Sequence, residues 1–549
     1  MRHLDDEKAG MKVYQHLATL LAEQGVQTMF GLLGDANMYV AGAFEDAGGR
    51  FVRVAHEASA VCMADAYARM TGRWAVATVT HGPGFTNTLT ALVEAARFTS
   101  PVLLVTGDPP PEPTHMQRLD IGAVCASVGV AHERVHRPET AVRDVLRALR
   151  RLQASQAPVV LNIPIPISLS ESSSESGTAA TVFGDTRVAV MPDEATLDTA
   201  LGLAVSAARP VVVAGRGVVA AGAEQAVAEL AEVLGAALFT SGLGIGLFGG
   251  HPRHLGIAGS IAHPEATSIL MDSDCVIAIG TSLNKYTSFG GELFSGKTLV
   301  HIDADPVKLG WLVTPTCGLA GDASVVARAM VEAIGHGELP EKRAWKQRCE
   351  EAAVAIAGWT PPDDRSGVGT IDIRVATQRI NALLPADSTV VSDVGRFIAG
   401  SWPYLTCTAP GLFTAMTGFG AIGLGLAAGT GAALSGRSAL TVLLVGDGGF
   451  MMSASELSTA VREKVPMVVL VYNDGAYGAE YQKLLNEGMA AEHSYNQWPD
   501  ITETARAFGA AAMSISHTDD IDAVAPVLAQ LDGPLVLDIR LDPTHHIIF

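Results

Sequence analysis

Short apolar runs, separated by stretches with the spacing of helices, mark the first part of the chain. In residues 12–25 the apolar side chains Val13, Leu17, Leu20 and Leu21 recur at helical intervals. The predicted strands are 26–30, 51–55, 74–80 and 102–106, and the predicted helices are 12–25, 58–70 and 86–98. Short strands that alternate with helices indicate a parallel sheet with helical crossovers.

The same pattern returns twice. Strands at 210–214, 275–279 and 299–302 with a helix at 224–234 predict a second unit, and a third begins at Ile371. Two stretches of small and polar residues, 169–180 and 358–369, are typical of linkers. We therefore predict an α/β protein with three doubly wound parallel-sheet domains, at 1–170, 190–340 and 370–549, of which the first and third resemble each other.

Acidic residues follow two apolar strands of the third unit. Leu440 to Val445 ends at Gly446-Asp447-Gly448-Gly449, and Val465 to Tyr472 ends at Asn473-Asp474-Gly475. Neighbouring parallel strands would put Asp447 and Asp474 side by side at the sheet edge where ligands bind. Glycines let backbone amides approach a ligand, and carboxylates suit a hard cation such as Mg²⁺ that holds a diphosphate. An ordinary strand–turn–helix stays open as the alternative.

Two further features concern local structure and proton chemistry. Ser453 and Glu456 have the spacing of a capping box, which predicts a helix that begins at Ser453. Glu57 follows an apolar strand and precedes a helix built from Ala, Met and Cys. In such a packed, dry setting we expect a raised pKa and a carboxyl group able to share a proton with a heterocycle. A helix N-terminal acid that only complements the helix dipole is the alternative.

Composition narrows the function classes. At 549 residues the chain is too long for one core. The net charge of −20 argues against a nucleic-acid or anionic-membrane partner. The six scattered cysteines predict free thiols in a reducing compartment, and neither a zinc site nor a disulfide framework. The first residues lack an apolar signal core, and the most apolar stretch, 419–434, is too short to span a membrane, so we expect a cytoplasmic protein.

Five ordered segments resemble those of thiamine-diphosphate (ThDP) enzymes of the acetolactate synthase, pyruvate oxidase and benzaldehyde lyase branch. Gly446-Asp447-Gly448 with Asn473-Asp474 resembles the ThDP signature, and His56 to Gly72 resembles the branch's glutamate segment. Thr80 to Asn87 looks like its Thr-Ser-Gly-Pro-Gly-Ala-Thr-Asn turn. Met116 to Asp120 resembles its glutamine-bearing segment, and Gly418 to Leu426 the segment that supports the bent cofactor.

The resemblance implies a role for each matching residue. The first domain would bind the pyrimidine of ThDP and the third its diphosphate. Asp447, Asp474 and the backbone carbonyl of Ala476 would coordinate Mg²⁺. Ile422 would support the cofactor, and the Gly420 carbonyl would accept from the pyrimidine amino group. The other implied cofactor contacts are Gly395, Arg396, Phe397, Gly446, Gly448, Gly449 and Tyr477, with Glu480 and Tyr481 in the pocket wall; the implied catalytic residues are Glu57, Gln117 and His81.

The resemblance also implies the reaction. Glu57 would protonate the pyrimidine ring and favour its imino form, which then takes the proton of the thiazolium carbon. The resulting ylide attacks a 2-oxo acid, CO₂ leaves, and the enamine either adds to a second carbonyl or is protonated. In this family the glutamate comes from one subunit and the metal site from its partner. That implies a homodimer as the minimum, with a homotetramer expected.

Departures from the family pattern bear on the substrate. The paired histidines of yeast-type pyruvate decarboxylase are absent, since Pro113-Thr114-His115-Met116 holds only one. Thr281 to Lys285 stands where acetolactate synthases carry Arg-Phe-Asp-Asp-Arg, so FAD or ADP in the middle domain stays open. His81 replaces a small residue, and it either donates protons to the intermediate or bonds a nearby carbonyl.

Three functions follow from these observations. The leading one is an acetolactate-synthase-like carboligase or lyase that acts on 2-oxo acids or aldehydes. A simple 2-oxo-acid decarboxylase of the benzoylformate or indolepyruvate type is the first alternative. A ThDP-binding regulatory subunit without catalysis is the second, and the presence of Glu57 argues against it.

Overall fold

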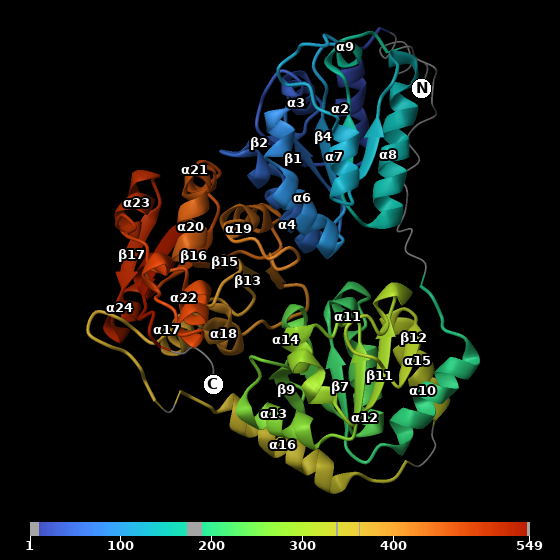
Figure 1. The fold of residues 1–549 in the computed structure, drawn as a ribbon, viewed down its shortest axis with the longest axis vertical. Coiled ribbons are helices and arrows are strands. Elements are labelled where there is room, and N and C mark those ends of the chain that lie inside the picture. The colour runs from blue at the N-terminus through green and yellow to red at the C-terminus, as the bar shows by residue number, and fades with distance from the viewer. Residues whose placement is uncertain (1–9, 173–188, 336–338, 362, 546–549) are drawn as a thin grey trace. The chain divides into compact units, whose positions relative to one another are not determined.

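Three six-stranded sheets flanked by helices make up the protein (Figure 1). The computed structural model describes residues 10–172, 189–335, 339–361 and 363–545. The predicted α/β fold with three parallel-sheet domains is confirmed. The chain divides into two compact units. The first contains the first and third sheets, the latter with Thr389–Gly395 and Thr414–Pro543, and the second contains the middle sheet and Arg396–Phe413.

The first sheet has the strand order β2-β1-β3-β4-β6-β5. Its pairs are parallel, with Met29 opposite Val76 and Leu104 opposite Val160. The strands are β1 (Thr28–Gly31), β2 (Arg50–Arg53), β3 (Ala75–Thr78), β4 (Val102–Thr106), β5 (Ala131–Arg134) and β6 (Val159–Asn162). The helices are α2 (Val13–Glu23), α3 (Met38–Asp46), α4 (Glu57–Thr71), α5 (Pro83–Thr86), α6 (Leu89–Phe98), α7 (Ile121–Ser127), α8 (Ala141–Ser155) and α9 (Ile165–Ser168). The helix predicted at 86–98 corresponds to α6, which begins three residues later, and the separate short helix α5 precedes it.

The third sheet repeats this arrangement. Its order, β14-β13-β15-β16-β18-β17, is the order of the first sheet with every number advanced by twelve, which confirms the predicted likeness of the outer domains. The strands are β13 (Thr389–Ser392), β14 (Phe413–Ala415), β15 (Thr441–Gly446), β16 (Met467–Asn473), β17 (Ala511–Ile515) and β18 (Leu535–Arg540). The helices are α19 (Gly425–Leu434), α20 (Asp447–Ser453), α21 (Leu457–Arg462), α22 (Gly478–Asn486), α23 (Ile501–Ala507), α24 (Thr518–Asp522) and α25 (Val524–Leu528).

The middle sheet has a different order, β12-β11-β10-β7-β8-β9, in which chain order reverses beside β7 as in doubly wound nucleotide-binding sheets. Its strands are β7 (Pro210–Ala214), β8 (Ala237–Thr240), β9 (His254–Ile257), β10 (Cys275–Ile279), β11 (Thr298–Asp303) and β12 (Cys317–Ala320). The helices of this unit are α10 (Glu194–Ser206), α11 (Arg216–Ala220), α12 (Glu224–Leu234), α13 (Pro264–Asp272), α14 (Lys285–Ser288), α15 (Ala323–Ile334), α16 (Arg343–Ala357), α17 (Ile373–Asn381) and α18 (Ile398–Ser401).

Helices α4 and α19 pack together and join the two outer domains into one core. Helix α4 is rich in Ala and α19 in Ala and Gly, which allows their backbones to approach closely. A Cβ atom placed on Gly431 would lie 2.3 Å from the carbonyl oxygen of Met63, so no larger residue fits at this crossing. Met63 and Ala428 are fully buried in the shared core.

One predicted helix start is wrong. Helix α20 begins at Asp447, directly after β15, and Ser453 is its last residue. The Ser453 hydroxyl donates to the Gly449 carbonyl one turn back, at 3.1 Å. The buried Glu456 carboxylate does not cap this helix, because it accepts a hydrogen bond from the backbone N–H of Ala55 in the first domain.

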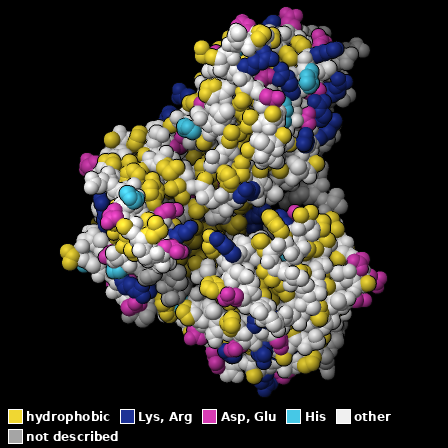
Figure 2. Space-filling view, in the orientation of Figure 1, with side chains coloured by type: hydrophobic (Ala, Val, Ile, Leu, Met, Phe, Trp, Pro, Cys, Tyr) yellow, Lys and Arg dark blue, Asp and Glu magenta, His cyan; other side chains and the backbone are white. Residues whose placement is uncertain are grey.

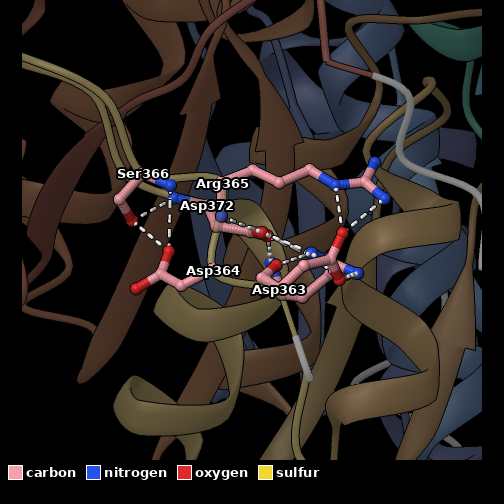
Figure 3. A network of polar contacts seen from close by, with 6 residues as sticks. Asp363, Asp364, Arg365, Ser366 and Asp372 are labelled. Atoms are coloured by element: carbon pink, nitrogen blue, oxygen red, sulfur yellow. Dashed lines mark hydrogen bonds and ion pairs between the residues drawn. The ribbon is translucent and has the colours of Figure 1, made fainter.

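The two predicted linkers have different outcomes. Residues 173–180 of the first lie outside the described residues. In the second, a polar network fixes the chain around Asp363 (Figure 3). The buried Arg374 pairs with Asp372 at 2.6 Å and with Asp363 at 3.4 Å. Burial would raise the pKa of Asp372, but hydrogen bonds from Arg374 and from backbone N–H groups hold that pKa below its usual value.

Basic side chains gather on the first domain where α8 lies (Figure 2). Arg147 of this helix pairs with Glu133 at 2.8 Å and with Asp144 at 2.9 Å, so acidic neighbours balance part of the charge. In the described parts of the chain, no helix combines the length and the apolar character that a membrane crossing needs.

Gly431→Ala should destabilise the protein, because the new methyl group would collide with the Met63 backbone. We expect the free energy of unfolding to fall by about 1–3 kcal/mol, the usual cost of overpacking. Denaturant titration followed by circular dichroism measures it. Gly42→Ala in α3 is the matched control, since its Cβ meets nothing within 4 Å and should leave stability unchanged or slightly higher. Equal stability of the two variants would contradict the tight α4–α19 crossing.

Candidate active site

Two aspartates meet at the carboxyl edge of the third sheet. Strands β15 and β16 pair in parallel with Gly446 opposite Tyr472, so Asp447 and Asp474 follow neighbouring strand ends. Asp447 is buried, and burial, followed by the negative charge of Asp474, raises the pKa of its carboxyl to about 7. Hydrogen bonds from the Gly448 N–H and the Trp498 indole act against this shift. Two carboxylates that disfavour each other's charge form an environment suited to a cation.

The neighbouring Asn473 has a different set of contacts. Its side-chain amide donates to the buried carboxylate of Asp538 at 2.7 Å, and its carbonyl oxygen accepts from the Gly475 N–H at 3.2 Å. Asp474 accepts from the Ala476 N–H at 3.2 Å. Asn473 is therefore held by the core of the sheet, while Asp474 carries the charge that acts on Asp447.

The turns around Asp447 tolerate only glycine. A Cβ on Gly448 would lie 2.8 Å from the ring of Tyr477, and a Cβ on Gly449 would lie 2.7 Å from Asp393 Oδ2. Glycine at these positions lets Tyr477 and Asp393 pack directly against the first turn of α20 and adds no side chain of its own beside the backbone amides. Gly420 has a φ of +81°, which favours glycine, and a Cβ there would meet nothing within 4 Å.

Asp393 organises these turns, and sequence reasoning missed it. Directly after β13, its buried carboxylate accepts from the N–H groups of Val394 and Gly423, each at 2.8 Å. Burial raises the pKa of Asp393 to about 6, although these hydrogen bonds act in the opposite direction. The available signal was its position, because a polar residue that follows a fully buried strand lies at the ligand edge of the sheet.

Trp498 is the second residue that sequence reasoning missed. Its indole N–H donates to Asp447 Oδ2 at 2.9 Å, and its ring lies edge-on to that of Tyr477, with centroids 6.4 Å apart. It comes from a loop after α22 without regular structure, so no periodic pattern marked it. Tyr481, predicted for the pocket wall, is buried against Tyr495, and Glu480 is exposed.

The remaining predicted cofactor contacts differ in their surroundings. Gly446 ends β15, and Ile422 is half-buried in the turn before α19. Gly395 belongs to the first compact unit, while Arg396 and Phe397 belong to the second. The Arg396 guanidinium donates to the His545 carbonyl at 2.9 Å. The assignment of these residues to a diphosphate stays a prediction.

Glu57 is the first residue of α4 at the carboxyl edge of the first sheet. Its carboxylate accepts from the Asn87 amide at 2.9 Å, and a Cβ on Gly84 would lie 3.7 Å from Glu57 Oε1. The expectation of a dry setting is wrong for the single chain, because Glu57 is only half-buried. The packed face of α4 begins two residues later, at Ser59.

His81 and Gln117 lie around the same turn as Glu57. The φ of Gly82 is +57°, and a Cβ there would lie 2.7 Å from the Gln117 carbonyl oxygen. His81 is buried, burial lowers the pKa of its ring, and the ring lies 5.8 Å from that of His115. Within the described residues, His81 Nδ1 has no hydrogen-bond partner. The structure thus brings the three predicted catalytic residues to one edge.

The donor set at the third sheet fits Mg²⁺ with a diphosphate. No group of three or more His, Cys, Asp or Glu side chains forms a metal centre in the described part of the chain. Two carboxylates with backbone oxygens are what Mg²⁺ uses when phosphates and water complete its shell. Backbone amides of a glycine turn are also the groups that bind phosphates in such sites.

Asp447→Asn should stabilise the metal-free protein, because it removes a buried charge beside Asp474. The raised pKa means that wild-type Asp447 destabilises the fold above pH 7 and has no such effect below about pH 4. We expect the free energy of unfolding of the variant to exceed that of the wild type by about 1–3 kcal/mol at pH 8. This difference should become smaller towards pH 5. Urea unfolding in EDTA measures it, with the exposed Asp387→Asn as control. A gain that is largest at pH 5 would contradict the assignment.

Family models match all three domains. The thiamine pyrophosphate enzyme N-terminal TPP binding domain matches residues 11–124, the central domain of such enzymes matches 197–330, and their C-terminal TPP binding domain matches 393–539. The matched segments contain Glu57, Asp447 and Asp474.

Curated relatives are similar over most of the chain. Isozyme 3 of the acetolactate synthase large subunit from Escherichia coli is 28% identical over 556 residues, covering 96% of this chain and 94% of that protein. A probable 2-ketoarginine decarboxylase from Pseudomonas aeruginosa is 30% identical over 529 residues, covering 92% and 90%. A sulfoacetaldehyde acetyltransferase from Rhodobacter capsulatus is 28% identical over 508 residues, covering 86% and 83%.

Proposed function

Because the chain belongs to the thiamine pyrophosphate enzyme family, we propose that it uses ThDP and Mg²⁺ to make or break C–C bonds in 2-oxo acids or aldehydes. The observation that carries the proposal is the buried Asp447 beside Asp474, above glycine turns that tolerate no side chain. Relatives that are a synthase, an acetyltransferase and a probable decarboxylase support a transferase or lyase.

Bound ThDP supplies the carbon nucleophile and the electron sink of this chemistry. Asp447, Asp474 and the Ala476 carbonyl would hold Mg²⁺, and the Gly448 and Gly449 amides would bind the diphosphate. Ile422 and the Gly420 carbonyl would orient the pyrimidine. Glu57 would exchange a proton with the pyrimidine ring nitrogen, and the Asn87 amide orients its carboxyl group by donating to it at 2.9 Å.

His81 and Gln117 act on the substrate side of the site. Burial lowers the pKa of the His81 ring, so the ring, once protonated at Nδ1, is a stronger acid than a solvated histidine. An acid at this position would protonate a carbanion after CO₂ loss. This favours the simple 2-oxo-acid decarboxylase as the second candidate, beside the acetolactate-synthase-like carboligase or lyase.

The assembly we propose is a homodimer at minimum, and a homotetramer in the cytoplasm. The half-buried Glu57 supports this, because the partner subunit's metal site would then cover it. FAD or ADP in the middle domain stays an open alternative for a further ligand.

Product analysis separates the candidate functions. The purified chain is incubated with ThDP and Mg²⁺ and with pyruvate or an aryl 2-oxo acid, and acyloins are separated from free aldehydes. A carboligase yields acyloins, and a simple decarboxylase yields aldehydes. Turnover of neither substrate class together with tight ThDP binding would favour a regulatory subunit.

Glu57→Gln should leave ThDP bound but lower turnover, because the amide cannot pass a proton to the pyrimidine ring. We expect kcat to fall by about 10²–10⁴-fold, the usual contribution of a positioned acid or base. Steady-state kinetics and calorimetric titration of ThDP measure the two effects. Unchanged turnover would contradict the proposed role.

Asp474→Ala should affect cofactor binding, and Asn473→Ala should affect stability. Asp474→Ala should abolish Mg²⁺-dependent ThDP binding, because it removes one of the two carboxylates. Asn473→Ala should keep that binding but lower the free energy of unfolding by about 1–3 kcal/mol, since the buried Asp538 loses a hydrogen bond. Calorimetry and urea unfolding give the two readouts. The reverse order would mean that the metal ligand is Asn473.

A further inference from the structure

Each outer domain sends one buried glutamate to the backbone of the other. Glu94, on α6 of the first domain, accepts from the N–H of Gly418 at 3.1 Å and from the N–H of Phe419 at 2.6 Å. Glu456, between α20 and α21 of the third domain, accepts from the N–H of Ala55 at 3.1 Å. Both glutamates are buried: Glu94 is 0% exposed and Glu456 is 1% exposed.

The two contacts occupy equivalent places in the two domains. Glu94 and Glu456 each lie on the helical segment that follows the third strand of their sheet, β3 and β15. Ala55 and Gly418 each follow the second strand of theirs, β2 and β14. Because the two sheets have the same strand order, the contacts are reciprocal. The helices after these turns, α4 and α19, pack on each other between them.

Both turns lead directly to residues of the proposed active site. Ala55 stands two residues before Glu57, and Phe419 immediately precedes Gly420. The Gly418–Gly420 turn has further support from α6, since the Arg97 guanidinium lies 4.6 Å from the centre of the Phe419 ring.

The two glutamates differ in how the charge of the carboxylate is balanced. Glu94 pairs with the buried Arg69 at 3.1 Å, and Arg69 also binds Asp65 at 2.6 Å and the Ala415 carbonyl at 2.9 Å. The Gly418 turn is therefore held at both ends by one buried network. Glu456 has both carboxylate oxygens near the Ala55 N–H, at 3.1 and 3.3 Å. Hydrogen bonds between backbone N–H groups and buried carboxylates are among the stronger neutral-to-charged contacts in proteins.

We propose that Glu94 and Glu456 are reciprocal positioning residues. Glu456 fixes the chain that delivers Glu57 to the pyrimidine ring, and Glu94 fixes the turn whose Gly420 carbonyl receives the pyrimidine amino group. The catalytic consequence rests on the proposed function, while the positioning of the two turns does not.

Amide hydrogen exchange on the cofactor-free full chain tests directly whether Glu94 and Glu456 hold the two turns. Glu456→Gln keeps one carbonyl oxygen as an acceptor, and Glu456→Met keeps none. The exchange rate of the Ala55 N–H should therefore increase from the wild type to Glu456→Gln and again to Glu456→Met. We expect Met to accelerate it by about 10- to 100-fold, the equivalent of one lost hydrogen bond to a charge. Glu94→Gln should accelerate exchange at Gly418 and Phe419 and leave Ala55 unchanged.

Glu463→Gln is the matched control. It removes another carboxylate contact between the same domains, the 2.5 Å pair with Arg50, but this pair touches neither turn. Its exchange pattern and kcat should equal those of the wild type. The same acceleration in Glu463→Gln, or none in Glu456→Met, would overturn the proposal. If Glu94→Gln fails to fold, the Glu456 series alone decides.

Cofactor and turnover measurements complete the test. Glu456→Gln should lower kcat about tenfold with the Kd for ThDP unchanged, because orientation of the acid is lost while the diphosphate anchor remains. Glu94→Gln should raise the Kd for ThDP about tenfold, because it loosens the pyrimidine turn. Equal effects of both variants on Kd and kcat would overturn the positioning roles. A wild-type chain that binds no ThDP would refute the proposed function. The exchange result would then still decide whether Glu94 and Glu456 hold the two turns.

Discussion

The proposed metal site depends on the repulsion between two carboxylates at one edge of the third sheet. Because β15 and β16 are adjacent and parallel, the backbones of Asp447 and Asp474 are held side by side at the ends of these strands. Burial and the charge of Asp474 raise the pKa of Asp447 to about 7, so the metal-free site holds an unfavourable negative charge near neutral pH. A divalent cation removes that cost, and the backbone amides of the neighbouring glycines suit the phosphates it would hold. The local destabilisation is thus the physical basis of the proposed cofactor affinity.

Around this edge, buried carboxylates set the positions of backbone turns. Asp393 connects the end of β13 to the turn before α19 through the Gly423 N–H. Glu94 and Glu456 connect each outer domain to the other. All three accept hydrogen bonds from backbone N–H groups, which fixes main-chain atoms instead of mobile side chains. The small residues of α4 and α19 let the two domains approach closely enough for these contacts to form.

The sequence was sufficient wherever one chain segment carries its own signal. Strands such as 102–106, 210–214 and 275–279 were predicted with their observed bounds, because fully buried parallel strands are continuous apolar runs. The adjacency of Asp447 and Asp474 was predicted because each follows an apolar run that forms a buried parallel strand. Contacts between distant segments left no such signal: Trp498 reaches Asp447 from a loop, and Asp393 belongs to no periodic pattern. Glu456 looked like a helix cap because only the tertiary structure shows that Ala55 is its partner. The stretch 358–369 looked like a linker by composition, yet ion pairs fix it.

Calorimetric titration of ThDP into the metal-free wild-type chain, once with Mg²⁺ and once with EDTA, tests the central claim most directly. We expect one binding site per chain that requires Mg²⁺ and that disappears in Asp447→Asn. Binding that is equally tight in EDTA, or that persists in Asp447→Asn, would contradict the assignment of the metal and diphosphate site to the carboxyl edge of the third sheet.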